Sequence, residues 1–298
     1  MAKLRSIVLR NYRRFAGEIE LPLDPGINLI SIPAGLGKTS ILEAVSWCLL
    51  GAELVSEPEQ VPNIEALGKG MTDVLVGLEF VNGERLERYA LFSYLAGKVE
   101  QEAWGWRLMD AASGKVVSEG DCADDFADQQ ERLFPESCVH ANLINGPALR
   151  RAVAGWRGGV ERAVSCSNNW CTSDLSLRCS VEATGLFLSL CPEAPVNALG
   201  YDPEGRLELS VHGPLTEAGV HLALLSHAVS FAEENAKVCP IFLDDPFGPF
   251  DGPDRTAQFE ALVGSLPSRQ VVFLLSDQRD IAALWSTGKV DKELEIRG

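Results

Sequence analysis

The apolar positions along the chain repeat with two periods, and each period predicts one kind of element. Apolar residues recur every three or four positions over 217–236, which is typical of a helix that packs on a core. Short apolar or alternating runs bounded by turn residues indicate strands, and an Asn-Gly turn joins two of them as a hairpin. The predicted strands cover residues 26–32, 73–80, 86–94, 104–109, 196–201, 207–211, 238–243 and 270–275. The predicted helices cover residues 40–50, 121–133, 147–164, 217–236, 253–264 and 277–285.

The order of these elements predicts two lobes and a connector. Residues 1–155 form an N-terminal lobe with the hairpin, and residues 196–298 form a C-terminal lobe. In the second lobe strands and helices alternate, which is typical of an α/β unit. Residues 156–195 carry no sustained heptads and are expected to form an irregular connector.

A glycine-rich segment lies between the first predicted strand and the first predicted helix. It runs Ile-Pro-Ala-Gly-Leu-Gly-Lys-Thr over residues 32–39, close to the phosphate-loop pattern Gly-x-x-x-x-Gly-Lys-[Ser/Thr]. In such a loop, backbone N–H groups and the helix N-terminus surround phosphate oxygens, Lys38 reaches the β- and γ-phosphates, and Thr39 binds Mg²⁺. The residues assigned to the nucleotide are Pro33, Ala34, Gly35, Leu36, Gly37, Lys38, Thr39 and Ser40.

Ile32 occupies the place of the first glycine of that pattern. A β-branched residue at this position is expected to change how the chain approaches the loop. The alternative is a chance Gly-Lys-Thr turn that binds no phosphate, but the flanking strand and helix favour the phosphate loop.

A second chemical signal follows the apolar run over 238–243, which ends in Asp244-Asp245-Pro246. A buried strand that ends in an acid can deliver a carboxylate to Mg²⁺, directly or through water. The next acid can act as general base on an attacking water. The alternative is an acidic surface turn with Pro246 and Gly248.

The two signals carry a resemblance to a known family. Residues 4–15, Leu-Arg-Ser-Ile-Val-Leu-Arg-Asn-Tyr-Arg-Arg-Phe, and 25–30 resemble the opening of ABC-type ATPase heads of the SMC/RecF class, which includes DndD-like proteins. Residues 244–251, Asp-Asp-Pro-Phe-Gly-Pro-Phe-Asp, resemble the Walker B strand and D-loop of that class. The family works in DNA repair, chromosome organisation and phage defence. Its long coiled coil is missing from this sequence.

The resemblance implies the fold class: an α/β P-loop NTPase of ABC-head type, with a mixed sheet and an antiparallel N-terminal subdomain. It implies ATP and Mg²⁺ as ligands, with Asp244 and Thr39 on the metal. Arg13 matches a basic residue that approaches the phosphates in some members, and Asp251 matches the D-loop acid.

Several positions depart from the family pattern. Asn145 stands where the Q-loop glutamine is usual, Thr216 and Ala218 replace the signature Ser and Gly, and Asp277 replaces the switch His. Asp245 stands for the catalytic Glu; its shorter side chain misplaces the carboxylate by about 1 Å, which can cost about 10²-fold in rate. Asp277 cannot donate a hydrogen bond to a phosphate when ionised. Both Asp245 and Asp277 remain the catalytic candidates, and binding of ATP is better supported than fast hydrolysis.

The resemblance and the departures from it indicate two alternative functions. The first is a slow, Mg²⁺-dependent ATPase head whose ATP-dependent pairing with a second head, most simply a homodimer, drives a DNA-repair or phage-defence complex. The alternative is a nucleotide-binding scaffold or sensor subunit with little turnover. An ABC transporter subunit is a third possibility, disfavoured by the poorly formed signature segment.

Composition limits the partners of the chain. Its 298 residues carry 26 basic and 42 acidic side chains, a net charge of −16, so DNA contact is expected only through a DNA-binding or effector partner. No apolar run reaches the ~18 residues of a membrane span, and no apolar signal region opens the sequence. A cytoplasmic location is therefore expected.

The cysteines predict no metal site. Cys48 and Cys239 fall in apolar segments and are expected in the core. The cluster Cys166, Cys171, Cys179 and Cys191 matches no zinc spacing, which favours ordinary thiols over a metal site.

Overall fold

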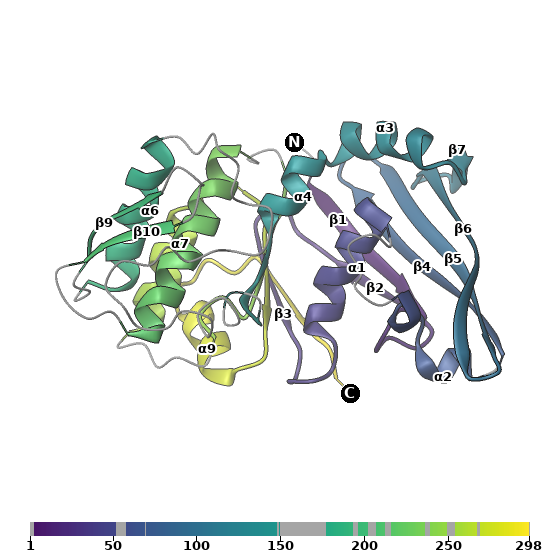
Figure 1. Cartoon of the computed structure of the whole chain (residues 1–298), viewed down its shortest axis with the longest axis horizontal. Helices are drawn as coiled ribbons and strands as arrows, with labels where there is room; N and C mark the ends of the chain where they lie inside the picture. The colour runs from purple at the N-terminus through teal and green to yellow at the C-terminus, as the bar shows by residue number, and fades with distance from the viewer. Residues whose placement is uncertain are drawn as a thin grey trace.

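Two large β-sheets, a two-stranded pair and the helices packed on them make up the described part of the chain, as the computed structural model shows (Figure 1). The fold class predicted from the sequence is confirmed: an α/β structure that combines a parallel and an antiparallel sheet. The structure describes residues 3–51, 58–68, 70–147, 149, 177–192, 196–201, 207–211, 216–235, 239–248, 254–266 and 269–297.

The antiparallel sheet has the strand order β2-β1-β4-β5-β6-β7. Its bounds are β1 Leu4–Arg10, β2 Glu18–Pro22, β4 Met71–Phe80, β5 Glu84–Leu95, β6 Lys98–Asp110 and β7 Lys115–Gly120. The predicted hairpin is confirmed as β4 and β5, and Gly83 in its turn has a φ of 86°, which favours glycine.

The parallel sheet has the order β13-β3-β12-β11-β8 and draws its strands from both ends of the chain. Its bounds are β3 Ile27–Ser31, β8 Leu143–Asn145, β11 Ile241–Asp244, β12 Val271–Leu275 and β13 Lys292–Glu295. Strands β11 and β12 are buried at every position, which explains their uninterrupted apolar sequences. A separate antiparallel pair, β9 (Val196–Tyr201) and β10 (Leu207–Val211), lies near α6 and confirms the two strands predicted over residues 196–201 and 207–211.

Helices cover both sheets. Their bounds are α1 Lys38–Leu50, the 3₁₀ turn η2 Pro58–Gln60, α2 Ile64–Leu67, α3 Ala123–Leu133, α4 Glu136–Asn142, α6 Leu177–Leu190, α7 Glu217–Asn235, α8 Arg255–Gly264 and α9 Gln278–Ser286. Helix α1 contacts β4 and β5 on one side and β8 and β11 on the other, so it joins the two sheets (Figure 1). In the described part of the chain, no helix is both long and apolar enough to cross a bilayer.

One prediction needs correction, because residues 177–190 of the expected irregular connector form helix α6. This helix packs on α7 and α8, and that tertiary contact stabilises a segment whose sequence lacks a regular heptad. Most of the helix predicted over 147–164 lies outside the described residues. The short strands β2, β7, β8 and β13 and the helices α2 and α4 were not predicted.

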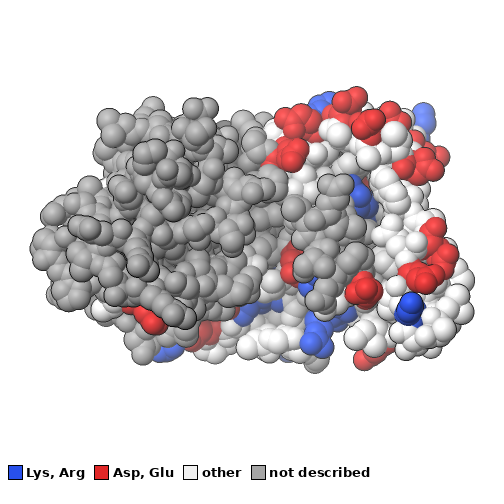
Figure 2. Space-filling view, viewed as in Figure 1, with Lys and Arg blue, Asp and Glu red and all other residues white. Residues whose placement is uncertain are grey.

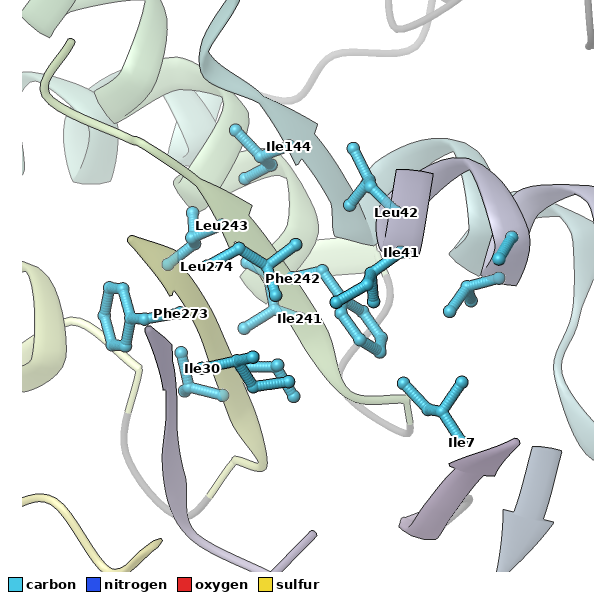
Figure 3. Close-up of a cluster of buried hydrophobic side chains, with 14 of the residues drawn as sticks. Ile7, Ile30, Ile41, Leu42, Ile144, Ile241, Phe242, Leu243, Phe273 and Leu274 are labelled. Carbon is cyan, nitrogen blue, oxygen red and sulfur yellow. The ribbon is translucent and has the colours of Figure 1, made fainter. Parts of the chain in front are cut away.

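The core lies where the parallel sheet meets α1 (Figure 3). Phe242 of β11 is fully buried there, on the same side of the sheet as Ile41 of α1. On the other side, Phe259 of α8 packs edge-on against Phe247 at 4.8 Å and Phe273 at 5.6 Å. These contacts surround β11, which ends at Asp244, with Asp245 directly after it.

The side-chain amide of Gln270 connects the start of β1 in the antiparallel sheet to the parallel sheet. The Gln270 Nε2 donates to the backbone oxygens of Leu4 (2.6 Å) and Asp24 (2.8 Å), and its Oε1 accepts from the Leu4 N–H (2.7 Å). Because Gln270 directly precedes β12, these bonds hold β1 beside the parallel sheet. Every one of them is buried or partly buried, where hydrogen bonds are costly to lose.

Cys48 and Cys239 are buried, as predicted. Cys191 is partly buried, whereas Cys166, Cys171 and the side chain of Cys179 lie outside the described residues. Among the residues that are described, no group of three or more His, Cys, Asp or Glu side chains is placed to hold a metal ion.

We expect His227 to make the fold less stable as the pH falls. This histidine is buried in α7, and burial lowers its pKa from 6.5 to about 4. The unfolded chain therefore binds a proton that the folded chain excludes, and stability is lost as the pH falls from 6.5 towards 4. The slope from one such group reaches about 1.4 kcal/mol per pH unit.

The measurement is urea unfolding near pH 7 and near pH 5, compared between wild type and His227→Leu. Acidic groups contribute equally to both proteins, so the difference between their slopes isolates His227. Equal slopes would show that His227 is protonated in the folded state.

Candidate nucleotide-binding site

The glycine-rich segment forms a loop between β3 and α1. The Ile32 N–H donates to the Leu275 oxygen at 2.9 Å, so Ile32 extends the β3–β12 ladder, and its side chain is fully buried. This explains how a β-branched residue is accommodated in place of the first glycine: it belongs to the strand and the core. The loop begins after it, with Pro33 to Leu36 exposed.

Gly37 is required where it stands. It has a φ of 113° and immediately precedes α1. A β-carbon on Gly37 would lie 3.0 Å from Cζ of Phe15 and 3.2 Å from Cβ of Arg14. The turn after β1 therefore packs directly on the last glycine of the loop, and only a residue without a side chain fits there at that φ.

Thr39 meets the end of β11. Its Oγ1 donates to Oδ2 of Asp244 at 2.8 Å, although the two residues are 205 positions apart. Asp244 is fully buried. A hydroxyl and a carboxylate oxygen at this spacing are hard ligands of the kind that Mg²⁺ takes from proteins.

Lys38 meets the second acid of the same segment. Its Nζ lies 2.6 Å from Oδ2 of Asp245, and both side chains are mostly buried. Asp245 also accepts from the backbone N–H of Ser276 (3.2 Å) and from its hydroxyl (3.3 Å). Its φ is 41°, a left-handed conformation that is uncommon outside glycine and is found at sites where the surrounding structure holds it.

Asn145 lies beside these acids. It is the last residue of β8 and pairs in register with Asp244. The structure thus brings together five residues predicted from the sequence: Lys38, Thr39, Asn145, Asp244 and Asp245.

The position of Gly146 leads to a prediction about the packing of β8 against Asp244 and Asp245. A β-carbon there would lie 2.3 Å from the Asp245 oxygen and 2.4 Å from the Asp244 oxygen, so Gly146→Ala must displace the backbone of both acids. We expect a loss of about 1–3 kcal/mol in the free energy of unfolding, measured by urea denaturation, because overpacking costs that much in rigid interiors. Gly185→Ala is the matched control, since a β-carbon on this exposed residue of α6 meets nothing within 4 Å. Equal stability of the two variants would contradict the close approach of β8 to the acids.

The other predicted residues lie apart from this group or have different partners. Arg13 forms an ion pair with Glu43 on α1. Asp277 caps α9 by accepting from the Arg279 N–H (2.8 Å), and the Arg279 guanidinium lowers the pKa of that carboxyl. Thr216 caps α7, where its Oγ1 accepts from the Gly219 N–H (3.1 Å). Asp251 lies outside the described residues.

Several residues around the acids were not predicted. Arg255 of α8 forms an ion pair of 2.8 Å with the buried Asp280 of α9, and burial nevertheless raises the Asp280 pKa to about 6. The Nε2 of His221, on α7, lies 2.7 Å from the Pro246 oxygen and fixes the turn after Asp245. The only sequence signal for Asp280 was its place in the first turn of a helix that follows a central strand.

Comparisons with known proteins found one family model and several solved structures similar to this chain. The family model, described as an AAA domain, matches residues 6–89, which contain most of β1 and the β3–α1 loop. A search of curated proteins found no relative in sequence.

Solved structures resemble the whole chain. A crystal structure of an SMC head bound to the C-terminal winged-helix domain of ScpA has a TM-score of 0.65 at 12% identity, covering 99% of this chain and 94% of that one. The SMC head of Thermotoga maritima gives 0.55 at 15% identity, with 99% and 95% covered. A Pyrococcus furiosus Smc head with an extended coiled coil, bound to the C-terminal domain of ScpA, gives 0.59 at 11% identity, with 98% and 92% covered.

These solved structures show that the chain has the fold of an SMC head domain, as the resemblance of its motifs predicted.

Proposed function

We propose that this protein is an ATP-binding head of SMC type that holds Mg²⁺–ATP between the β3–α1 loop and the end of β11, and hydrolyses it slowly. The observation that carries the proposal is the double contact of two distant segments. Lys38 and Thr39 are adjacent in the loop, and they bind the adjacent acids Asp245 and Asp244. A turn that binds no ligand does not need both of these pairs for its packing, whereas a site for phosphate and Mg²⁺ does need them.

The residues fit this ligand. The loop leads directly into the first turn of α1, with Gly37 in the left-handed conformation before it, so backbone N–H groups at the helix N-terminus can donate to phosphate oxygens. Thr39 and Asp244 would hold Mg²⁺, which usually takes only one or two protein ligands besides phosphates and water. A bound Mg²⁺ would neutralise charge on the transferred phosphoryl group.

Lys38 and Asp245 are proposed to exchange partners when nucleotide binds. Lys38 leaves Asp245 for a phosphate, and the released carboxylate can accept a proton from an attacking water. Ser276 remains bound to Asp245 and keeps it oriented. Because of this exchange, the affinity for ATP and the availability of Asp245 as general base both depend on the Lys38–Asp245 ion pair.

A second head is proposed to complete the site. Thr216 begins α7 and is exposed, and the hydrogen bond of its hydroxyl stays within the first turn of that helix. By its resemblance to the signature segment, it would face a nucleotide on a paired head. Two of the structural relatives are heads bound to ScpA domains, which supports a partner protein for this chain as well.

The setting proposed is a DNA-repair or phage-defence complex in which DNA is held by a partner. The net charge of −16 disfavours direct DNA contact. Helix α3 contributes to this with the exposed acids Asp124, Asp125, Asp128 and Glu131, and Figure 2 shows acidic side chains gathered along that part of the molecule.

A nucleotide sensor with little turnover is the second candidate. Asp277, which stands at the switch position, is bound to Arg279 and cannot donate to a phosphate. The Asp245 side chain is shorter than the glutamate that is usual at this position, and it already forms an ion pair with Lys38.

The test combines calorimetric ATP binding, turnover and mass in solution with and without Mg²⁺–ATP. Binding with dimerisation and turnover supports the ATPase head. Binding without turnover, whatever the mass, supports the sensor. A chain that binds no ATP overturns the proposal.

A further inference from the structure

The cations around the proposed site are almost all neutralised by carboxylates. Lys38 pairs with Asp245 at 2.6 Å, Arg13 with Glu43, Arg255 with Asp280 at 2.8 Å, and Arg279 with Asp277 at 2.8 Å. A nucleotide triphosphate brings several negative charges to a place that already holds Asp244 and Asp245. Lys38 is proposed to exchange Asp245 for a phosphate, but breaking further buried or half-buried ion pairs would be costly, so the ligand favours an additional positive charge that is not already paired.

Arg14 is the exception among these cations. It is exposed, and within the described part of the chain it has no ion pair. Its β-carbon lies 3.2 Å from where a β-carbon on Gly37 would be, so it borders the last glycine of the loop. The turn that carries it is fixed by its buried neighbours Tyr12 and Phe15, since the Phe15 N–H donates to the Tyr12 oxygen at 2.8 Å.

Arg13, the arginine expected to approach the phosphates, is anchored elsewhere. Its N–H donates to the Val61 oxygen at 2.9 Å, and its own oxygen accepts from Nδ2 of Asn63 at 2.7 Å. Its guanidinium binds Glu43 with only 18% of the side chain exposed. Turning Arg13 toward the loop would leave Glu43 without its cation, whereas Arg14 gives up only water.

We propose that Arg14, and not Arg13, binds the phosphates of the nucleotide. This inference rests on the proposed function, because it assigns a further ligand to the same site. A guanidinium forms two parallel hydrogen bonds with phosphate oxygens and stays charged at every physiological pH, so an exposed arginine beside the loop suits that role.

The experiment measures ATP affinity by calorimetry for wild type, Arg14→Ala, Arg14→Lys and Arg13→Ala. A hydrogen bond to a charged group contributes about 1.5–3 kcal/mol, so Arg14→Ala should bind ATP at least about tenfold more weakly. Arg14→Lys should recover part of the loss, since it keeps the charge but not the paired donors. Arg10→Ala is the matched control, an arginine of the same strand region that is paired with Glu18 and Asp73.

Glu43→Gln separates the two arginines. If Arg13 turned to the phosphates, releasing it from Glu43 would tighten ATP binding, whereas our assignment expects the affinity to stay within about twofold. Wild-type affinity in Arg14→Ala, or tighter binding in Glu43→Gln, would overturn the inference. If wild type still binds ATP in that case, the proposed function stands; if wild type binds none, both fail. Since Arg14 is exposed, unchanged thermal stability of its variants would exclude misfolding as the cause.

Discussion

Lys38→Ala is expected to abolish measurable ATP binding. Lys38 is the first residue of α1, and its ammonium already lies 2.6 Å from a site carboxylate, so it occupies the place where phosphates would collect. The substitution removes a charge-assisted contact worth about 1.5–3 kcal/mol. It also leaves Asp245 without its cation, and an uncompensated carboxylate repels phosphate. Together we expect the affinity to fall by at least about 100-fold.

The measurement is a calorimetric or fluorescent-nucleotide titration with Mg²⁺ present. Lys115→Ala is the control, because Lys115 is exposed on β7, in the antiparallel sheet. Thermal unfolding of both variants confirms that they fold. If Lys38→Ala bound ATP as wild type does, the β3–α1 loop would not be a phosphate site, and the double contact with β11 would need another explanation.

Asp245→Asn is expected to have two opposite effects: tighter ATP binding and loss of turnover. The amide cannot take a proton from water and no longer competes with phosphate for the charge of Lys38. The backbone should be unaffected, because asparagine tolerates the left-handed φ of 41° better than most residues. We expect affinity to rise several-fold and any turnover to fall by about 100-fold or more.

Both quantities are measured on the same preparation, with Asp73→Asn as the control, an exposed acid paired with Arg10 on the antiparallel sheet. Tighter binding with unchanged turnover would assign the base to another residue. Unchanged binding would mean that Lys38 does not have to leave Asp245, and the exchange of partners would be wrong.

The sequence predicted those strands and helices whose apolar pattern can be recognised without reference to their neighbours in the fold. Strands β11 and β12 are uninterrupted apolar runs, and helix α7 repeats at helical spacing, so each is recognisable by itself. Strand β13 has the sequence Lys-Glu-Leu-Glu and forms only because β3 offers it an edge to pair with. Strand β8 has three residues and is likewise defined by its partner β11.

The candidate site likewise has features that the sequence predicted and contacts that it did not predict. The loop and the two acids were visible because their chemistry requires fixed residue types at fixed spacing. The ion pair of Arg13 with Glu43 and the contact of Ser276 with Asp245 were not, since each depends on which helix or strand lies alongside in three dimensions. The resemblance therefore predicted a phosphate contact for Arg13, whereas the structure shows an ion pair of Arg13 with the Glu43 carboxylate.

The interleaved order of the parallel sheet also bears on synthesis at the ribosome. Strand β3 has β12 on one side and β13 on the other, and both come from residues after 270. A nascent chain that has emerged only as far as Asp245 therefore contains every residue of the double contact but lacks both neighbours of the strand that leads into the loop. If the head binds ATP as proposed, such a chain would not yet hold the loop in place, and nucleotide capture would mark a head whose translation has passed β12.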